Sequence, residues 1–205
     1  MIFVLILLVG TSLAPARSAP GGQRPRPHPS PSPTKPAVQS PLPPPTGHLN
    51  DYSHALNDDT RAQLEQALVE LQKRSKIEFA VVLVNTTGGK PIGDYSKAVA
   101  DGWNVGSGGD GILLLLAVDD HQWRIQTTRG LARDLPDEKI KEVAALMNPA
   151  LGQGHNGDGV RRGLEAVIRI LAAKRGFAPI TIPAPLLPGD LVLGNLFSFV
   201  EGSLT

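Results

Sequence analysis

Two continuous apolar runs and one alternating run predict the strands of a small sheet. Residues 77–84 and 112–118 are apolar apart from Glu78, a pattern typical of strands that are covered on both faces. Residues 123–128 alternate apolar and polar side chains, as a half-buried strand does. Only the polar residues 119–122 separate this stretch from the second apolar run, so we predict a β-hairpin at the centre of the domain.

Four further stretches repeat apolar residues every three or four positions, which is the spacing of an amphipathic helix. The first follows residues 57–60, which offer several possible helix caps, among them a capping-box pattern at residues 60–63, and the second spans residues 94–102. The third lies between Pro136 and Pro149, which we expect to begin and end it, and the fourth covers residues 158–175. The side chains expected to be buried are Leu64, Ala67, Leu68 and Leu71; Tyr95, Ala98 and Val99; Ile140, Val143, Ala144 and Met147; and Val160, Leu164, Val167, Ile168 and Leu171.

The order of these elements predicts the architecture. Because a strand, a helix and a strand precede the hairpin, we expect the first two strands to be parallel and the third to be antiparallel. The predicted fold class is α/β, a three-layer α/β/α sandwich around a small mixed sheet with helices on both faces. We assign this domain to residues 47–177. Residues 178–205 form a C-terminal tail interrupted by four prolines, and the sequence does not decide whether the tail is ordered.

The N-terminal segment predicts an exported protein. Residues 1–16 combine an apolar block with an Ala-x-Ala ending, which is typical of a signal peptide, and the block is too short to span a bilayer. We therefore expect no transmembrane helix in the mature chain and a periplasmic, extracellular or envelope-associated location. Residues 17–46 predict a disordered linker, because 11 prolines between residues 20 and 45 favour polyproline II. The linker is either a spacer or, at residues 24–27 and 41–45, a ligand for a proline-recognising module.

Charge and motifs argue against several classes of function. Between residues 48 and 177 the chain has 16 basic and 17 acidic side chains, so it lacks the positive excess that nucleic-acid binding requires. Residues 106–111 match G-x-G-x-x-G, but they precede a predicted strand instead of following one, so we expect no nucleotide or organic cofactor. The chain has no cysteine, no G-x-S-x-G elbow and no H-E-x-x-H pair, which leaves catalytic residues unassigned.

Four aspartates form a candidate site for a divalent cation. Asp110 precedes the second long strand, and Asp134 and Asp137 follow the strand antiparallel to it, so these three should emerge at one edge of the sheet. Asp51, before the first helix, joins them if that helix packs at the same edge. Carboxylates and loop carbonyls suit a hard cation such as Ca²⁺ or Mg²⁺. The alternative is structural, with Asp137 offsetting a helix dipole and Asp110 simply beginning a strand.

Several short motifs also follow one another in a fixed order along residues 47–177. They are Asp51-Tyr52 ahead of a leucine-rich helix, residues 79–84, Trp103-x-x-Gly106, residues 111–118, Arg124-Ile125 with Thr127 and Gly130-Leu131, the Pro149 loop, and the helix with Asp158, Gly163 and Val167. Together they resemble the TPM domain family, whose members include a thylakoid-lumen phosphatase, a photosystem II repair factor and an acetylcholine-receptor modulator. The resemblance implies an α/β/α sandwich in an extracytoplasmic domain and the binding of a divalent cation.

The chain departs from the family pattern in two places. It has Gly109-Asp110-Gly111 where the family commonly has Asp-Asn-Gly, and residues 128–132 lack one glycine and the carboxylate of Gly-x-Gly-Leu-Glu. We therefore expect an exported TPM-like module that acts mainly by binding a protein partner in the cell envelope, with a divalent cation at the Asp110 edge. The alternative is a weak metal-dependent acid phosphatase acting on phosphomonoesters, in which Asp110 and Asp137 hold the ion.

Overall fold

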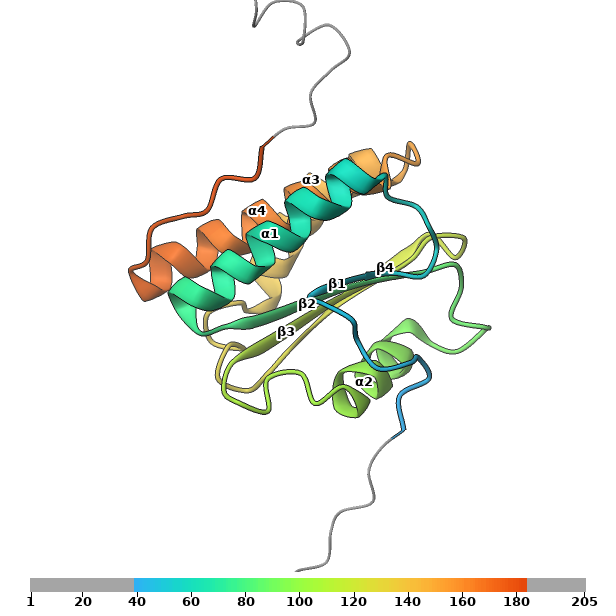
Figure 1. The fold of residues 1–205 in the computed structure, drawn as a ribbon, viewed down its shortest axis with the longest axis horizontal. Helices are drawn as coiled ribbons and strands as arrows, with labels where there is room; N and C mark the ends of the chain where they lie inside the picture. Colours follow the sequence, from blue (N-terminus) through green and yellow to red (C-terminus); the bar gives the residue numbers. More distant parts are fainter. Residues whose placement is uncertain (1–38, 184–205) are drawn as a thin grey trace, which may run out of the picture. The chain divides into compact units, whose positions relative to one another are not determined.

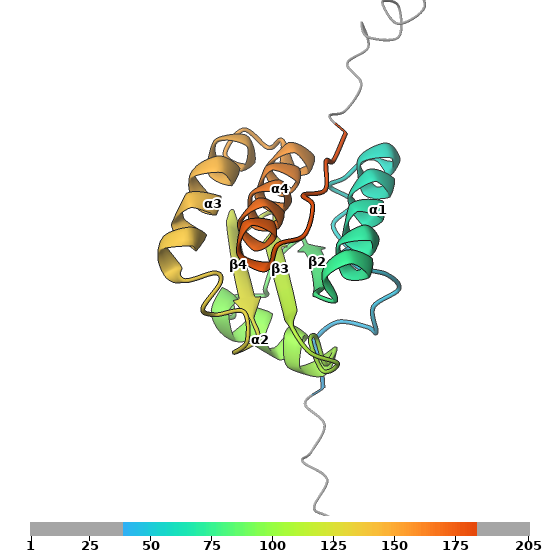
Figure 2. The ribbon, with the colours of Figure 1, turned by 90° about the vertical axis from the view of Figure 1, so that its left-hand side faces the viewer.

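The computed structural model describes residues 39–183 of the chain. Its elements are β1 (Leu49–Asp51), α1 (Asp58–Ser75), β2 (Glu78–Val84), α2 (Ile92–Gly102), β3 (Gly111–Ala117), β4 (Gln122–Thr127), α3 (Asp137–Leu151) and α4 (Asn156–Arg175). The strands form one sheet, with α1, α3 and α4 on one face and α2 on the other (Figure 1, Figure 2). The predicted α/β/α sandwich with helices on both faces of a mixed sheet is confirmed.

The strands lie in the order β1-β2-β3-β4. β2 and β3 are parallel over their whole length, from the Glu78–Gly111 pair to the Val84–Ala117 pair, and β4 is antiparallel to β3. Both pairings agree with the sequence prediction. The sequence did not predict β1, which adds a parallel edge strand beside β2. Its 3 residues are too few for an alternating pattern to identify a strand.

The two faces of the sheet carry two separate hydrophobic cores, because neighbouring side chains of a strand point in opposite directions. On one face, Phe79 and Leu114 belong to a core that includes Leu64 of α1 and Leu164 of α4. On the other face, Leu113 and its neighbours pack with residues of α2. Since both faces are covered, β2 and β3 bury apolar side chains at successive positions, which explains their continuous apolar runs.

The structure decides between the possible caps of α1 and extends α3 past its predicted end, and α2 and α4 each begin two residues before their predicted starts. α1 begins at Asp58, and its N-cap is Asn57, whose side chain accepts a hydrogen bond from the N–H of Thr60 at 2.7 Å. Thr60 is therefore a buried residue within the helix and not its cap. α3 continues through Pro149 and ends at Leu151. The proline lies in the last turn, so its missing N–H costs the helix only one hydrogen bond close to an end that frays in any case.

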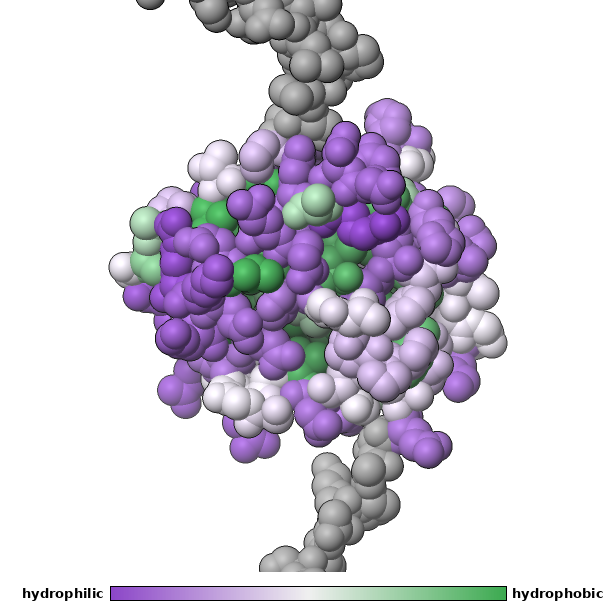
Figure 3. Space-filling model, viewed as in Figure 1, coloured by the Kyte–Doolittle hydropathy of each residue, from purple (hydrophilic) through white to green (hydrophobic). Residues whose placement is uncertain are grey.

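Chain on both sides of residues 47–177 also packs on the sandwich. Trp103 donates from Nε1 to the carbonyl of Pro43 at 2.9 Å, and Ile182 is buried as part of the core to which α1 and α4 contribute. The predicted signal peptide, most of the predicted linker and residues 184–205 lie outside the described residues. Within residues 39–183, no helix is both long and apolar enough to cross a membrane. The face seen in Figure 3 is largely hydrophilic, with hydrophobic residues visible between polar ones.

Candidate functional site

An arginine joins two of the four candidate aspartates at the amino end of β3. Asp110 immediately precedes β3, and Asp134 lies in the connection between β4 and α3. Arg175, the last residue of α4, donates from Nη1 to Asp110 Oδ2 at 2.8 Å and from Nε to Asp134 Oδ2 at 2.6 Å. The structure therefore brings Asp110 and Asp134 to one edge of the domain, with a guanidinium group between them.

These three side chains, which we call the Arg175 triad, are partly exposed. The exposed fractions of the side chains are 35% for Arg175, 25% for Asp110 and 20% for Asp134. The hydrogen bonds to Asp134 and then to Asp110 raise the pKa of Arg175 above its ordinary value, so the guanidinium stays charged at every physiological pH. Its positive charge is the counter-charge for the two carboxylates.

The triad does not suit a hard divalent cation as it stands. Ca²⁺ takes about six to eight oxygen ligands, whereas one oxygen of each carboxylate here already accepts a hydrogen bond from Arg175. Gly130 lies against the other oxygen of Asp110, so closely that a Cβ at this position would overlap it. Within the part of the chain that the structure describes, no group of three or more His, Cys, Asp or Glu side chains is placed to hold a metal ion.

The other two candidate aspartates do not belong to the triad. Asp137 is an exposed residue in the first turn of α3, where its charge favours the positive end of the helix dipole. Asp51 ends β1 and pairs in register with Leu83 at the carboxyl end of β2. Asp110, in contrast, accepts a backbone hydrogen bond from Glu78 at the amino end of β2. The length of β2 therefore separates Asp51 from the Arg175 triad.

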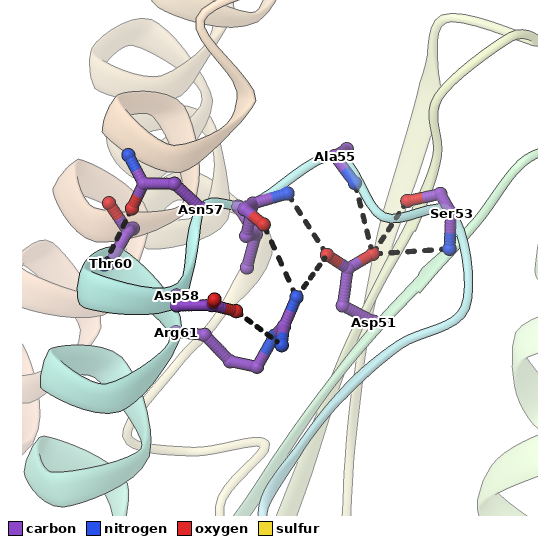
Figure 4. Close-up of polar contacts among 8 residues, drawn as sticks. Asp51, Ser53, Ala55, Asn57, Asp58, Thr60 and Arg61 are labelled. Carbon is purple, nitrogen blue, oxygen red and sulfur yellow. Dashed lines mark hydrogen bonds and ion pairs between the residues drawn. The ribbon is translucent and has the colours of Figure 1, made fainter.

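Asp51 is a buried carboxylate bound by the loop that follows it (Figure 4). Its Oδ1 accepts hydrogen bonds from the N–H groups of Ser53 and Ala55 at 3.1 and 3.3 Å, and from the Ser53 hydroxyl at 2.8 Å. Its Oδ2 accepts from the N–H of Leu56 at 2.9 Å and lies 4.0 Å from Arg61. Since the side chain is 0% exposed, these donors assign Asp51 the structural task of fixing the chain's entry into α1.

The glycine-rich residues 106–111 allow close packing at the amino end of β3. Gly106, with a φ of 76°, lies against Gly111 and Thr128 and leaves no space for a Cβ. Its N–H donates to the carboxylate of Glu78 at 2.8 Å, and the N–H of Gly111 donates to the Thr128 hydroxyl at 3.1 Å. The spacing of these glycines is thus explained by the packing of the loop onto the sheet.

At the opposite end of the sheet, Asp120 connects the β3–β4 turn to the loop after β2. Its Oδ2 accepts a hydrogen bond from the N–H of Thr87 at 2.8 Å, and its Oδ1 accepts one from the Thr86 hydroxyl at 2.8 Å. These bonds, that from the Thr87 N–H first, lower the pKa of Asp120 below its ordinary value. Asp120 therefore ties together two connections at the carboxyl ends of β2 and β3.

Beside this end of the sheet is a hollow of about 400 Å³, which we call the Trp123 hollow. The residues lining it are Leu116, Val118, His121 and Trp123 from β3 and the hairpin, and Asn148, Leu151, Gly152 and Asn156 from α3, α4 and their connection. Trp123 donates from Nε1 to Asn148 Oδ1 at 2.9 Å, which fixes the indole against α3. The hollow lies beside the carboxyl end of β3, and ligands of α/β sheets are usually bound near the carboxyl ends of the strands.

Sequence reasoning missed this hollow because its walls come from segments that are distant along the chain. Trp123 fits a rim or core aromatic, and His121 fits an ordinary turn residue when each is considered alone. The structure gives His121 a φ of 51°, a left-handed conformation that is uncommon for a residue with a side chain. The local signal for this site is weak, since it consists of a tryptophan at the start of β4 that follows a histidine of the hairpin turn by two residues.

Comparisons with known proteins agree with the fold. The chain is similar to the solution structure of an N-terminal domain from P. gingivalis, with 25% identity, a TM-score of 0.58, and coverage of 66% of this chain and 88% of that one. The BA42 protein of the psychrophilic bacterium Bizionia argentinensis has 18% identity, a TM-score of 0.53, and coverage of 66% and 93%, respectively. The N-terminal domain of cg2496 from Corynebacterium glutamicum has 15% identity, a TM-score of 0.50, and coverage of 60% and 78%.

The chain matches no curated protein. A model of the TPM domain matches residues 49–170, more than half of the sequence, and the chain therefore belongs to the TPM domain family.

Proposed function

We propose that this chain is an exported binding module whose TPM domain receives an extended segment of a protein partner at β4 and the Trp123 hollow. The observation that carries the proposal is the hollow itself, whose volume of about 400 Å³ falls in the range usual for ligand sites. Asn148 already holds the indole of Trp123 in place, so binding requires little further ordering of this side chain.

β4 supplies a second element of recognition because it is the outer strand of the sheet. The N–H of Thr128 donates to the carbonyl of Gly111, and hydrogen-bonded pairs alternate along antiparallel strands. By this alternation, the backbone groups of Trp123, Ile125 and Thr127 point away from β3. An extended peptide that pairs with these groups adds a strand to the sheet and brings one of its side chains to the hollow.

The proposed location is the cell envelope or the extracellular space. It rests on the composition of residues 1–16, which is typical of a signal peptide, and on the proline-rich residues 17–46, which are typical of a spacer. A spacer of this kind gives a small binding domain additional reach toward a partner. Cell fractionation of a tagged full-length chain tests this part, and recovery in the cytoplasm with residues 1–16 intact would contradict it.

A peptide-display selection against the full 205-residue chain tests the binding site. The chain has two tryptophans, and they lie on opposite sides of the sheet, since Trp123 packs with the core under α1, α3 and α4 and Trp103 with the core under α2. Selected peptides should shift the indole N–H signal of Trp123 in NMR spectra and leave that of Trp103 in place. Trp123→Ala should weaken binding at least tenfold, whereas the matched Trp103→Ala should not. Peptides that bind Trp123→Ala as tightly as the wild type would place the site elsewhere.

The alternative function is a weak metal-dependent phosphatase, and a single assay distinguishes it from the peptide-binding function. Asp110 is bound to Arg175, and Asp137 lies outside the triad, so the two residues that would share the ion each have another structural role. We therefore expect no turnover of p-nitrophenyl phosphate at acid or neutral pH with Ca²⁺, Mg²⁺ or Mn²⁺ present. Turnover that disappears in Asp110→Asn would establish the phosphatase instead.

A further inference from the structure

We infer that Arg175 takes the place of a divalent cation between Asp110 and Asp134 and thereby closes this edge of the domain to metal ions. The inference does not depend on the proposed peptide binding, because it concerns the other end of the sheet. It rests on the convergence of three separate segments, the residue before β3, the β4–α3 connection and the last residue of α4, on one point.

The charges at this point explain why a cationic group is required. Two carboxylates brought to one edge repel each other unless a positive charge lies between them. The guanidinium of Arg175 meets this need with two different nitrogens, since Nε reaches Asp134 and Nη1 reaches Asp110 at 2.6 and 2.8 Å. A planar group with several fixed donors can join two carboxylates in this way, whereas a compact ammonium cannot present the same fork.

A metal ion must displace this arginine in order to bind. The side chain of Arg175 is 35% exposed, so ions from solvent have access to the triad, and burial is not what keeps them out. What excludes them is the direct pairing of the guanidinium with both carboxylates, together with its positive charge at the point where the ion would lie. Removing the guanidinium while keeping Asp110 and Asp134 should therefore leave an acidic pair that attracts Ca²⁺.

The pairing also has a task within the fold. Arg175 ends α4, and a positive charge in the last turn favours the negative end of the helix dipole. Lys174 lies in the same turn, is exposed, and belongs to no ion pair among residues 39–183. The variant Lys174→Gln therefore removes a charge from the same helix end without touching the triad, which makes it the matched control for Arg175→Gln.

The experiment is a Ca²⁺ titration of the full chain, followed by calorimetry and by the amide signals of Asp110 and Asp134. We expect the wild type and Lys174→Gln to show no saturable shift of these two amides. Arg175→Gln should bind Ca²⁺ at least tenfold more tightly than the wild type, with both amides shifting, and adding Asp110→Asn should abolish this gain.

Two results would overturn the inference. One is saturable Ca²⁺ binding by the wild-type chain that shifts the amides of Asp110 and Asp134. The other is a folded Arg175→Gln variant that binds Ca²⁺ no better than the wild type. If Arg175→Gln does not fold, the same tenfold gain is required of Arg175→Met, which keeps the length of the aliphatic stem without the charge, and its failure to bind more tightly overturns the inference equally.

Discussion

Replacing Asp51 by alanine is the sharpest test of how the TPM domain is held together. The carboxylate is 0% exposed and accepts three backbone N–H groups and one hydroxyl, all from Ser53, Ala55 and Leu56. Hydrogen bonds to a charged group contribute about 1.5–3 kcal/mol each, and a buried donor left without a partner costs about 1–3 kcal/mol. Ser53 and Ala55 are only half-buried, so water can replace part of what they lose.

We therefore expect Asp51→Ala to lower the free energy of unfolding by about 3 kcal/mol, a large share of the about 5–15 kcal/mol that stabilises a typical domain. Asp51→Asn should cost about 2 kcal/mol, because one carboxamide oxygen can serve the donors at Oδ1 while the NH₂ group faces the N–H of Leu56. The order of stability should be wild type, then Asp51→Asn, then Asp51→Ala.

Urea unfolding followed by tryptophan fluorescence and circular dichroism measures these differences. For a slope near 2 kcal/mol per molar, Asp51→Ala should lower the midpoint by about 1.5 M. Asp59→Ala is the matched control, since Asp59 is exposed in the first turn of α1 and should change stability by less than about 1 kcal/mol. If Asp51→Ala lowers the free energy of unfolding by less than about 1 kcal/mol, the hydrogen bonds to this carboxylate do not stabilise the domain as argued. A stability difference between the wild type and Asp51→Ala that is present with Ca²⁺ and absent with EDTA would also refute this argument, because Asp51 would then be a cation ligand.

Three further predictions concern the core, the helix contact and the hairpin. Leu68→Ala should cost about 2–5 kcal/mol in urea unfolding, because Leu68 is fully buried in the core under α1. Gly163→Ala should cost about 1–3 kcal/mol, since its Cβ would overlap the side chain of Met147 where α3 and α4 pack, and a loss below about 0.5 kcal/mol would contradict this packing. The pKa of Asp120 is lower in the folded state than in the unfolded state. Its hydrogen bonds therefore add stability above the unfolded pKa of about 4, and this contribution is lost as the pH falls through the lower folded pKa. In an NMR titration the Thr87 amide should therefore shift with a midpoint below about 3.9, and a midpoint at or above that value would contradict the prediction.

The periodic parts of the chain predicted the fold, whereas the short and irregular parts did not. Continuous apolar runs identified β2 and β3 because these strands are covered on both faces, and the alternation after the turn identified β4. β1 escaped because 3 residues carry no pattern, and its identity depends on pairing with β2. The sequence leaves the cap of α1 open among residues 57–60 because several of them are good caps, and only the fold determines which side chain meets a free N–H.

The candidate site could be predicted only as far as strand direction determines it. The antiparallel pairing of β3 and β4 is what puts Asp110 and the segment after β4 on the same edge. Nothing in the local sequence indicates that Arg175, 65 residues from Asp110, completes that edge. The Trp123 hollow could not be predicted either, because its walls depend on how the end of α3 packs beside the hairpin. Ionic and concave sites of this type arise from tertiary packing and leave no periodic trace in the sequence.

The two ends of β3 should therefore behave as independent sites. At about 3.3 Å per residue, the 7 residues of β3 place the Arg175 triad and the Trp123 hollow roughly 20 Å apart, and perturbations at that distance without shared partners usually add. Peptide affinity at the hollow should be the same in Arg175→Gln as in the wild type, with or without Ca²⁺. Likewise, Trp123→Ala should leave the gain in Ca²⁺ affinity of Arg175→Gln unchanged. Coupling of more than about tenfold between the two would mean that the sheet transmits changes from one end to the other, and the domain would then be a cation-responsive binder and not a rigid one.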